Sequence, residues 1–221
     1  MKEQQKKYEL TDEFIEHWSG KKLYRIRALV TFGSVVVGQL GGFVESEKNL
    51  DQSLLGNAWV FDDAQVFDDA RVYGDAWVYG NAWVFDDAQV YGNAQVYGNA
   101  QVSGNAWVFD DARVSGDARV SGDARVSGDA RVYGDASVRS YAIISDKKMI
   151  FLASNVGSEN GTLTVFNGKG GLIVTRGCFT GTVDEFLSKS AKVHDDKTRN
   201  EYKLLIEVAK SRILGVKNER N

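Results

Sequence analysis

The sequence of 221 residues contains no proline, one cysteine and two histidines. At the usual frequency of about 5%, a chain of this length would carry roughly eleven prolines. Proline removes a backbone N–H donor, so its absence predicts a fold in which nearly every backbone N–H is needed for hydrogen bonding.

The scarcity of cysteine and of long apolar runs sets the expected compartment. Cys178 alone cannot form an internal disulfide or a metal site, which is typical of a reducing compartment. The chain has no 18-residue apolar run, and residues 1–7 contain no apolar core of a signal peptide. With 43% apolar residues, 26% charged residues and a net charge of −3, we expect a globular cytoplasmic protein without a membrane segment.

A period of six residues dominates the middle of the sequence. Alanine occupies every sixth position from Ala58 to Ala142, and valine follows two residues later from Val60 to Val138, with Ile144 closing the series. In each unit Ala-x-Val alternates as a strand does, and the following Gly or Asp with Asp or Asn suits a tight corner. A helical stripe needs spacings of three and four. The repeat therefore predicts fifteen short strands in a chain that coils and stacks on itself.

The pattern Val-x-Gly-(Asp/Asn)-Ala-x resembles the hexapeptide repeat of left-handed parallel β-helices. The resemblance implies three units in each triangular coil, with the aliphatic and small residues facing inward. We predict an all-β dominated protein, a left-handed parallel β-helix of about five to six coils with an N-terminal β cap and a small α/β C-terminal domain.

The parts before and after the repeat have other patterns. We assign residues 1–34 to the cap, 35–144 to the β-helix with a phase break at 45–56, and 145–221 to the C-terminal domain. A strand is expected at 23–29 after a turn at Ser19-Gly20, and a partial coil is expected to place four residues inward: Val35, Val37, Gly41 and Phe43.

In the C-terminal domain, strands are expected at 149–153, 162–166 and 172–176. A capping box from Thr182 to Glu185 predicts a short helix, and residues 198–214 form a longer amphipathic pattern. We expect this domain to cover the last open edge of the β-helix.

A second resemblance extends over the whole chain. Four segments are similar to phage and prophage hexapeptide-repeat proteins of variable repeat number: Tyr8–Thr11, Leu23–Ile26, Gly41–Leu50 and Gly177–Thr182. This resemblance implies a viral gene expressed in the host bacterial cytoplasm, and it implies no known activity.

The histidines argue against the best-known activities of hexapeptide β-helices. The family's acyltransferases use a histidine base, and its carbonic anhydrases use three histidines on zinc. Here His17 and His194 both lie outside the repeat, where we expect them to be solvated. We therefore predict a protein that is not an enzyme and has no metal or cofactor.

The charges of the repeat favour a structural role. Paired aspartates such as Asp62-Asp63 suit calcium or acid–base chemistry, but they alternate with Gly-Asp and Gly-Asn, which favours corner formation. Residues 57–144 carry thirteen aspartates and six arginines, a net charge of −7, which disfavours nucleic-acid binding. An acidic surface that imitates DNA and direct neutralisation of the aspartates by arginines remain as alternatives; the arginines concerned are Arg113, Arg119, Arg125 and Arg131.

Aromatic residues occupy outward positions of the repeat and predict an interface. With the inward positions filled by alanine and valine, these rings need another surface to cover them. The predicted interface residues are Trp59, Trp77, Trp83, Trp107, Phe85, Tyr91, Tyr97 and Phe109. We expect self-association, as a homotrimer with parallel axes; stacking of the rings on one another is the alternative.

Small polar segments of the C-terminal domain are candidates for a phosphate site. Glycine turns with an arginine and hydroxyls can hold a phosphate. The predicted ligand-binding residues are Ser158, Asn160, Thr162, Arg176 and Thr180. Cys178 is expected to be buried in a strand.

The functional hypothesis is a non-enzymatic oligomeric binding protein of phage origin that antagonises bacterial defence by sequestering a nucleotide-type immune signal. Three alternatives remain open: a direct inhibitor of a host defence protein through the aromatic and acidic surface, a glycan-binding virion component, and a transferase that works without histidine.

Overall fold

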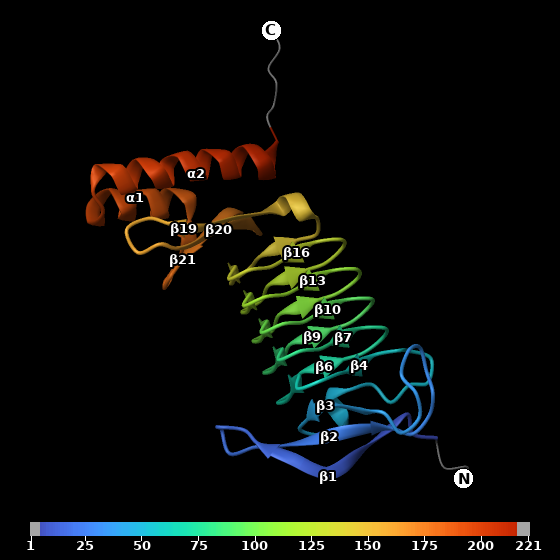
Figure 1. Cartoon of the computed structure of the whole chain (residues 1–221). Coiled ribbons are helices and arrows are strands. Elements are labelled where there is room, and N and C mark those ends of the chain that lie inside the picture. The colour runs from blue at the N-terminus through green and yellow to red at the C-terminus, as the bar shows by residue number, and fades with distance from the viewer. Residues whose placement is uncertain (1–4, 216–221) are drawn as a thin grey trace.

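Stacked parallel strands form a three-sided β-solenoid in the computed structural model, which describes residues 5–215. Figure 1 shows the N-terminal hairpin in blue at one end, the coils in the middle, and two helices in red at the other end. The first face contains β4 (Trp59–Val60), β7 (Trp77–Val78), β10 (Gln95–Val96), β13 (Arg113–Val114) and β16 (Arg131–Val132). The second face contains β3 (Leu40–Val44), β5 (Gln65–Val66), β8 (Trp83–Val84), β11 (Gln101–Val102), β14 (Arg119–Val120) and β17 (Ser137–Val138). The third face contains β6 (Arg71–Val72), β9 (Gln89–Val90), β12 (Trp107–Val108), β15 (Arg125–Val126) and β18 (Ile143–Ile144).

Alanine and valine fill the interior of the solenoid. Every alanine from Ala58 to Ala142 and every valine from Val60 to Val138 is at most 1% exposed. Strands pair in register between coils, for example Val96 with both Val78 and Val114. The predicted β-solenoid architecture, with about six turns, is therefore confirmed.

The corners contain residues in left-handed backbone conformations, as the repeat predicts. Glycine occupies most of these positions, while Asp62, Asp86 and Asp110 have φ values of 53°, 58° and 56°. The carboxylate of each such aspartate accepts a hydrogen bond from the next coil, as Asp62 Oδ2 does from the Gly80 N–H at 3.0 Å. This bond offsets the steric cost of a side chain in this conformation.

The N-terminal cap continues the second face as an antiparallel hairpin of β1 (Tyr8–Glu16) and β2 (Lys22–Ala28). Strand β2 confirms the strand expected at 23–29. The register of β3 pairs Phe43 with Gln65 and Val44 with Val66.

This register corrects the inward positions expected for the partial coil. Val44 lies inward in place of Phe43, which packs outside the coil with Leu23 and Phe67. The expectation for Val37 is also wrong, because 62% of its surface is exposed, whereas Val35 is buried as expected.

The phase break expected at 45–56 lies in the later part of that range. Leu50 lies six residues after Val44 and bridges to Val72, so the inward spacing continues across the short helix η1 (Glu47–Asn49). The extra residues lie between Leu50 and Ala58, where the chain crosses to the first face. The phase therefore changes only after Leu50.

Hydrogen bonds along the axis join each coil to the next and leave backbone groups of the first coil without a preceding partner. The outward residues donate to carbonyls of the following coil, as the Trp59 N–H does to the Ala76 carbonyl. The corresponding carbonyl of Ala58 has no donor from a preceding coil, because β4 is the first strand of its face. The buried Lys7 donates to the carbonyls of Gly56 at 2.9 Å and Ala58 at 3.0 Å, and burial lowers its pKa to about 8.

A four-stranded antiparallel sheet and two helices close the other end. The sheet contains β19 (Ile150–Val156), β20 (Gly161–Gly168), β21 (Gly171–Arg176) and β22 (Phe179–Thr182). A short helix, η2 (Lys147–Met149), leads into it, and α1 (Val183–Val193) and α2 (Asp196–Leu214) pack on it. The three expected strands, the capping box and both helices are confirmed, while β22 was not predicted.

Strand β20 joins this domain to the solenoid through its alternating side chains. Phe166 is buried in the solenoid core, and Thr164 Oγ1 accepts a hydrogen bond from the Ser137 N–H at 3.2 Å. Leu163 and Val165 point to the opposite side and pack with Tyr202 of α2. The domain therefore covers the last coil.

Replacement of a corner glycine tests the structural role of aspartate in the corners. Gly98 has a φ of +71°, and an added Cβ would lie 3.1 Å from the Gly116 nitrogen. We expect Gly98→Ala to lower the free energy of unfolding by about 1 to 2 kcal/mol. Gly98→Asp should lose less, because its carboxylate can accept the Gly116 N–H. Urea unfolding of both variants measures the difference.

Gly170→Ala is the matched control, because an added Cβ there would meet no atom within 4 Å. Equal losses for Gly98→Ala and Gly98→Asp would contradict the proposed role of the aspartates.

Candidate functional site

Trp59, the first residue of the predicted aromatic interface, is not available to a partner. Trp59 is fully buried under the N-terminal cap, with ring centroids 6.0 Å from Tyr8 and 5.4 Å from Phe32. The prediction that it belongs to an interface is wrong, because β4 has no preceding coil on its face and the cap covers its outward side.

The other predicted rings are half-buried within the chain because they stack along the axis. Phe85 stacks on Phe67 at 5.2 Å, Tyr97 on Tyr79 at 4.7 Å, and Phe109 on Tyr91 at 5.0 Å. Trp107 packs edge-on against Tyr91, as Trp77 does against Phe61 and Trp83 against Phe67. Stacking thus covers part of each ring, and the role of the remaining seven in an interface stays a prediction.

A more exposed aromatic side chain lies at the tip of the β1–β2 hairpin. Trp18 is 83% exposed and is not among the predicted interface residues. The sequence feature that indicates the exposure of Trp18 is its position directly before the turn at Ser19-Gly20.

The neighbouring His17 is buried, which corrects the expectation that it is solvated. It is 7% exposed, and its ring lies 4.6 Å from that of Phe67 and 5.4 Å from that of Trp83. Burial lowers the pKa of His17, the charge of Lys21 lowers it further, and Asp68 opposes the shift. His17 is therefore a neutral part of an aromatic cluster near neutral pH.

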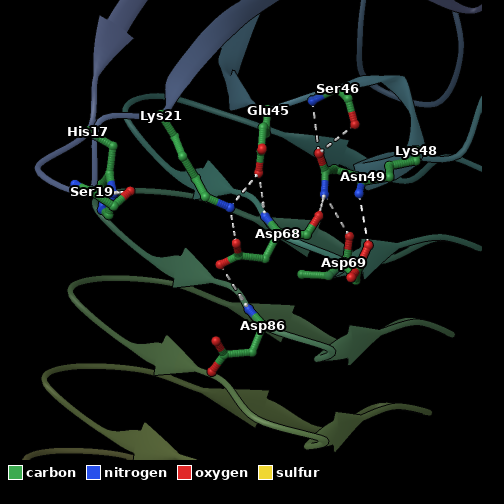
Figure 2. A network of polar contacts seen from close by, with 11 residues as sticks. His17, Ser19, Lys21, Glu45, Ser46, Lys48, Asn49, Asp68, Asp69 and Asp86 are labelled. Atoms are coloured by element: carbon green, nitrogen blue, oxygen red, sulfur yellow. Dashed lines mark hydrogen bonds and ion pairs between the residues drawn. The ribbon is translucent and has the colours of Figure 1, made fainter.

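A polar network beside His17 fastens the cap to the first corners of the second face (Figure 2). Lys21 forms ion pairs with Glu45 at 3.3 Å and with Asp68, while Glu45 accepts the Asp68 N–H at 2.7 Å. Lys48 pairs with Asp69 at 2.8 Å. These carboxylates already have partners, so the network is a structural connection between hairpin and solenoid.

The five predicted ligand-binding residues lie on different sides of the C-terminal sheet. Ser158 and Asn160 are exposed in the turn between β19 and β20. Thr162 hydrogen-bonds to Asp135 of the solenoid, and Thr180 pairs with Thr175, whose hydroxyl donates to a solenoid carbonyl.

Arg176 faces the helices instead. Its Nε donates to the Tyr202 hydroxyl at 3.1 Å and its Nη2 to the Val156 carbonyl at 3.2 Å. The structure therefore does not bring the five residues into one pocket. Cys178 is exposed in the turn before β22, which corrects the expectation of a buried thiol.

A large cavity, here called the arginine groove, lies between the first face and the C-terminal domain. Its volume is about 710 Å³. Its lining residues are Tyr97, Arg113, Ser115, Arg131, Tyr133, Ala136, Lys147, Ile150, Phe151, Leu152 and Arg212. Arginines of β13 and β16 thus face an apolar edge of β19 and the end of α2.

The charges in the arginine groove are only partly neutralised. Arg113 and Arg131 are register neighbours on adjacent strands, and within residues 5–215 neither forms a salt bridge. Lys147 differs, because it pairs with Asp129 at 2.8 Å and lowers the pKa of that carboxyl.

Direct neutralisation of aspartates by the repeat arginines is also not observed elsewhere in the described chain. The guanidinium of Arg125 lies 5.0 Å from the centre of the Trp107 ring. The aspartates instead accept corner hydrogen bonds, such as Asn99 to Asp117 and Asn105 to Asp123, both at 3.0 Å. Because the aspartates are hydrogen-bonded at the corners, the arginines remain available to another anion.

Comparison with known proteins supports the repeat architecture. A family model described as the YdcK beta solenoid repeat matches residues 64–80, 94–110, 100–116, 112–127 and 124–140, all within the solenoid. A search of curated proteins gave no match. No helix among the described residues is long and apolar enough to span a membrane. Residues 5–215 contain no cluster of three or more His, Cys, Asp or Glu side chains arranged to hold a metal ion.

The burial of His17 predicts a pH dependence of stability. Because its folded pKa is lowered, its contribution to stability is present above the unfolded value of about 6.5 and is lost as the pH falls below it. We expect the melting temperature to fall between pH 7.5 and 5.5, and less so for His17→Phe. His194→Gln should keep the wild-type slope. An unchanged slope in His17→Phe would contradict this assignment.

Proposed function

We propose that this chain is a non-enzymatic binding protein that sequesters a nucleotide-type ligand in the arginine groove. The observation that carries the proposal is the pair Arg113 and Arg131, which lie on adjacent strands without an acidic partner in the described chain. Two guanidinium groups one strand spacing apart repel each other, and a bound phosphate would stabilise both through charge-assisted hydrogen bonds.

The other walls of the groove suit the rest of a nucleotide. Tyr133 is 55% exposed and, with Phe151 of β19, offers ring surface for stacking a base. Arg212 of α2 adds a third guanidinium from the opposite wall. A volume of about 710 Å³ is within the usual range of roughly 300 to 1,000 Å³ for small-molecule sites.

The positions of the histidines support binding without turnover. His17 packs under the hairpin at the far end of the solenoid, and His194 follows α1. The groove residues supply positive charge and ring surface, which are means of holding a ligand. A general base of the kind that hexapeptide acyltransferases use is not among the lining residues.

The biological setting that we propose follows from the resemblance to phage and prophage hexapeptide-repeat proteins. A phage protein in the bacterial cytoplasm that holds a nucleotide signal tightly would lower its free concentration and silence the defence enzyme that depends on it. Occupancy is sufficient for this effect, so the proposal needs no catalysis.

Binding measurements test the groove directly. We expect calorimetry to detect binding of a cyclic dinucleotide or of ADP-ribose. Arg113→Gln and Arg131→Gln should each raise the dissociation constant about 10-fold or more, because a charge-assisted hydrogen bond contributes about 1.5 to 3 kcal/mol. Arg119→Gln is the matched control, since this arginine lies in the equivalent position on the second face.

The absence of heat with every nucleotide tested would refute the proposed function, as would equal weakening by Arg119→Gln and Arg131→Gln. In infected cells, the wild-type chain but not the Arg113→Gln/Arg131→Gln variant should suppress a nucleotide-dependent defence.

We also propose that the chain forms a homotrimer with parallel axes. The observation that supports self-association is Trp18, an exposed tryptophan on a hairpin held in place by an ion-pair network. Tryptophan is the residue type most enriched among side chains that anchor interfaces.

The mass in solution tests self-association. Light scattering after gel filtration should give about three times the chain mass of 24.4 kDa, and Trp18→Ala should shift the protein toward the single chain. Trp107→Ala, on a ring already half-covered by Tyr91, should have a smaller effect. A wild-type protein that stays a single chain at all concentrations would contradict the trimer.

A further inference from the structure

A second, smaller cavity lies inside the C-terminal domain, away from the solenoid. It has a volume of about 240 Å³ and is enclosed by the β21–β22 turn, α1 and the first half of α2. The arginine groove borders β19 and the end of α2, so the two cavities have no lining residue in common.

A buried hydroxyl in the wall of this cavity lacks a partner. Ser190 of α1 is 4% exposed, and its Oγ has no hydrogen-bond partner among the described residues. A buried polar group without a hydrogen-bond partner destabilises the folded protein. An acceptor atom of a ligand in the cavity would satisfy this hydroxyl.

Two cations and aromatic rings determine which ligand would fit. Lys189 lies with its Nζ 5.3 Å from the centre of the Phe179 ring. Arg176 lines the cavity and forms an ion pair at 3.8 Å through its Nη1 with Glu159, which also lines the cavity and whose side chain is 82% exposed. Phe186 of α1, 5% exposed, completes an apolar wall.

We propose that this cavity binds a small carboxylate with an apolar body, such as an aryl or short acyl carboxylate. The apolar part would lie against Phe179 and Phe186, and the carboxylate would face Lys189 and Arg176 and accept the Ser190 hydroxyl. A volume of about 240 Å³ suits a single ring rather than a nucleotide. This site is therefore separate from the function proposed for the arginine groove.

Cys178, the only cysteine in the sequence, lines this cavity, is exposed, and can report occupancy. Its thiolate attacks a sulfur of an aromatic disulfide, the S–S bond breaks, and the released aryl thiolate is measured by absorbance. One reagent is 5,5′-dithiobis(2-nitrobenzoate), whose halves are aryl carboxylates, and the other is the uncharged 4,4′-dithiodipyridine. We expect Lys189→Gln to slow the anionic reagent about fivefold or more and to leave the neutral reagent unchanged.

Lys192→Gln is the matched control, because it removes the same charge from α1 at a residue that does not line the cavity. Millimolar benzoate should slow labelling of the wild-type protein by both reagents, and calorimetry should show weaker benzoate binding to Ser190→Ala. Equal slowing by Lys189→Gln and Lys192→Gln would overturn the proposal, and so would labelling that benzoate leaves unchanged.

The Arg113→Gln/Arg131→Gln variant separates this inference from the proposed function. It should lose nucleotide binding and keep benzoate protection of Cys178. Loss of benzoate protection in this variant would contradict a separate site.

Discussion

The axial hydrogen bond from each coil to the next is the interaction on which the structure depends. Because each coil is hydrogen-bonded only to the coils on either side of it, the first coil and the last coil both present backbone groups that have no partner within the stack. Both ends therefore need side chains or strands that supply these partners. Lys7 and Asn49 donate to carbonyls at the first end, and Thr164 accepts from Ser137 at the last. The missing prolines have the same cause, since each would remove an axial donor.

The interior and the corners fix the repeat, while the outward positions remain free to carry function. Alanine, valine and the left-handed corner residue recur with little variation, because each is packed on the coil above and below. Outward side chains on the first face change from Trp59 and Trp77 through Gln95 to Arg113 and Arg131. The rings consequently lie toward the cap and the arginines toward the C-terminal domain. The arginine groove forms where this second group meets another surface.

The sequence was sufficient to predict what depends on local period and insufficient where distant segments decide the contacts. The β-solenoid and its corners follow from the spacing of six, and the C-terminal strands and helices from alternation and capping. The side of β3 that faces inward could not be predicted from local spacing. Pairing with β2 on one side and with β5 on the other sets the register of Phe43. Trp59 is buried by a cap that no repeat pattern describes. The predicted phosphate site failed because Thr162 and Arg176 point to opposite sides of the sheet, which depends on the β20–β21 register.

The net charge of the repeat does not describe the local charge on its first face. The repeat carries a net charge of −7, which argues against a polyanion along the whole surface. A small anion responds to the local electric field, which depends on whether the nearby charged side chains are paired with opposite charges. Corner aspartates accept hydrogen bonds from Asn side chains and from backbone N–H groups of the next coil, so geometry holds them at the edges of the prism. Arg113 and Arg131, which lie between the corners on the last two strands of the first face, receive no such partners in the described chain. An acidic solenoid can therefore present a cationic groove, because the corners hold one sign of charge and the faces the other.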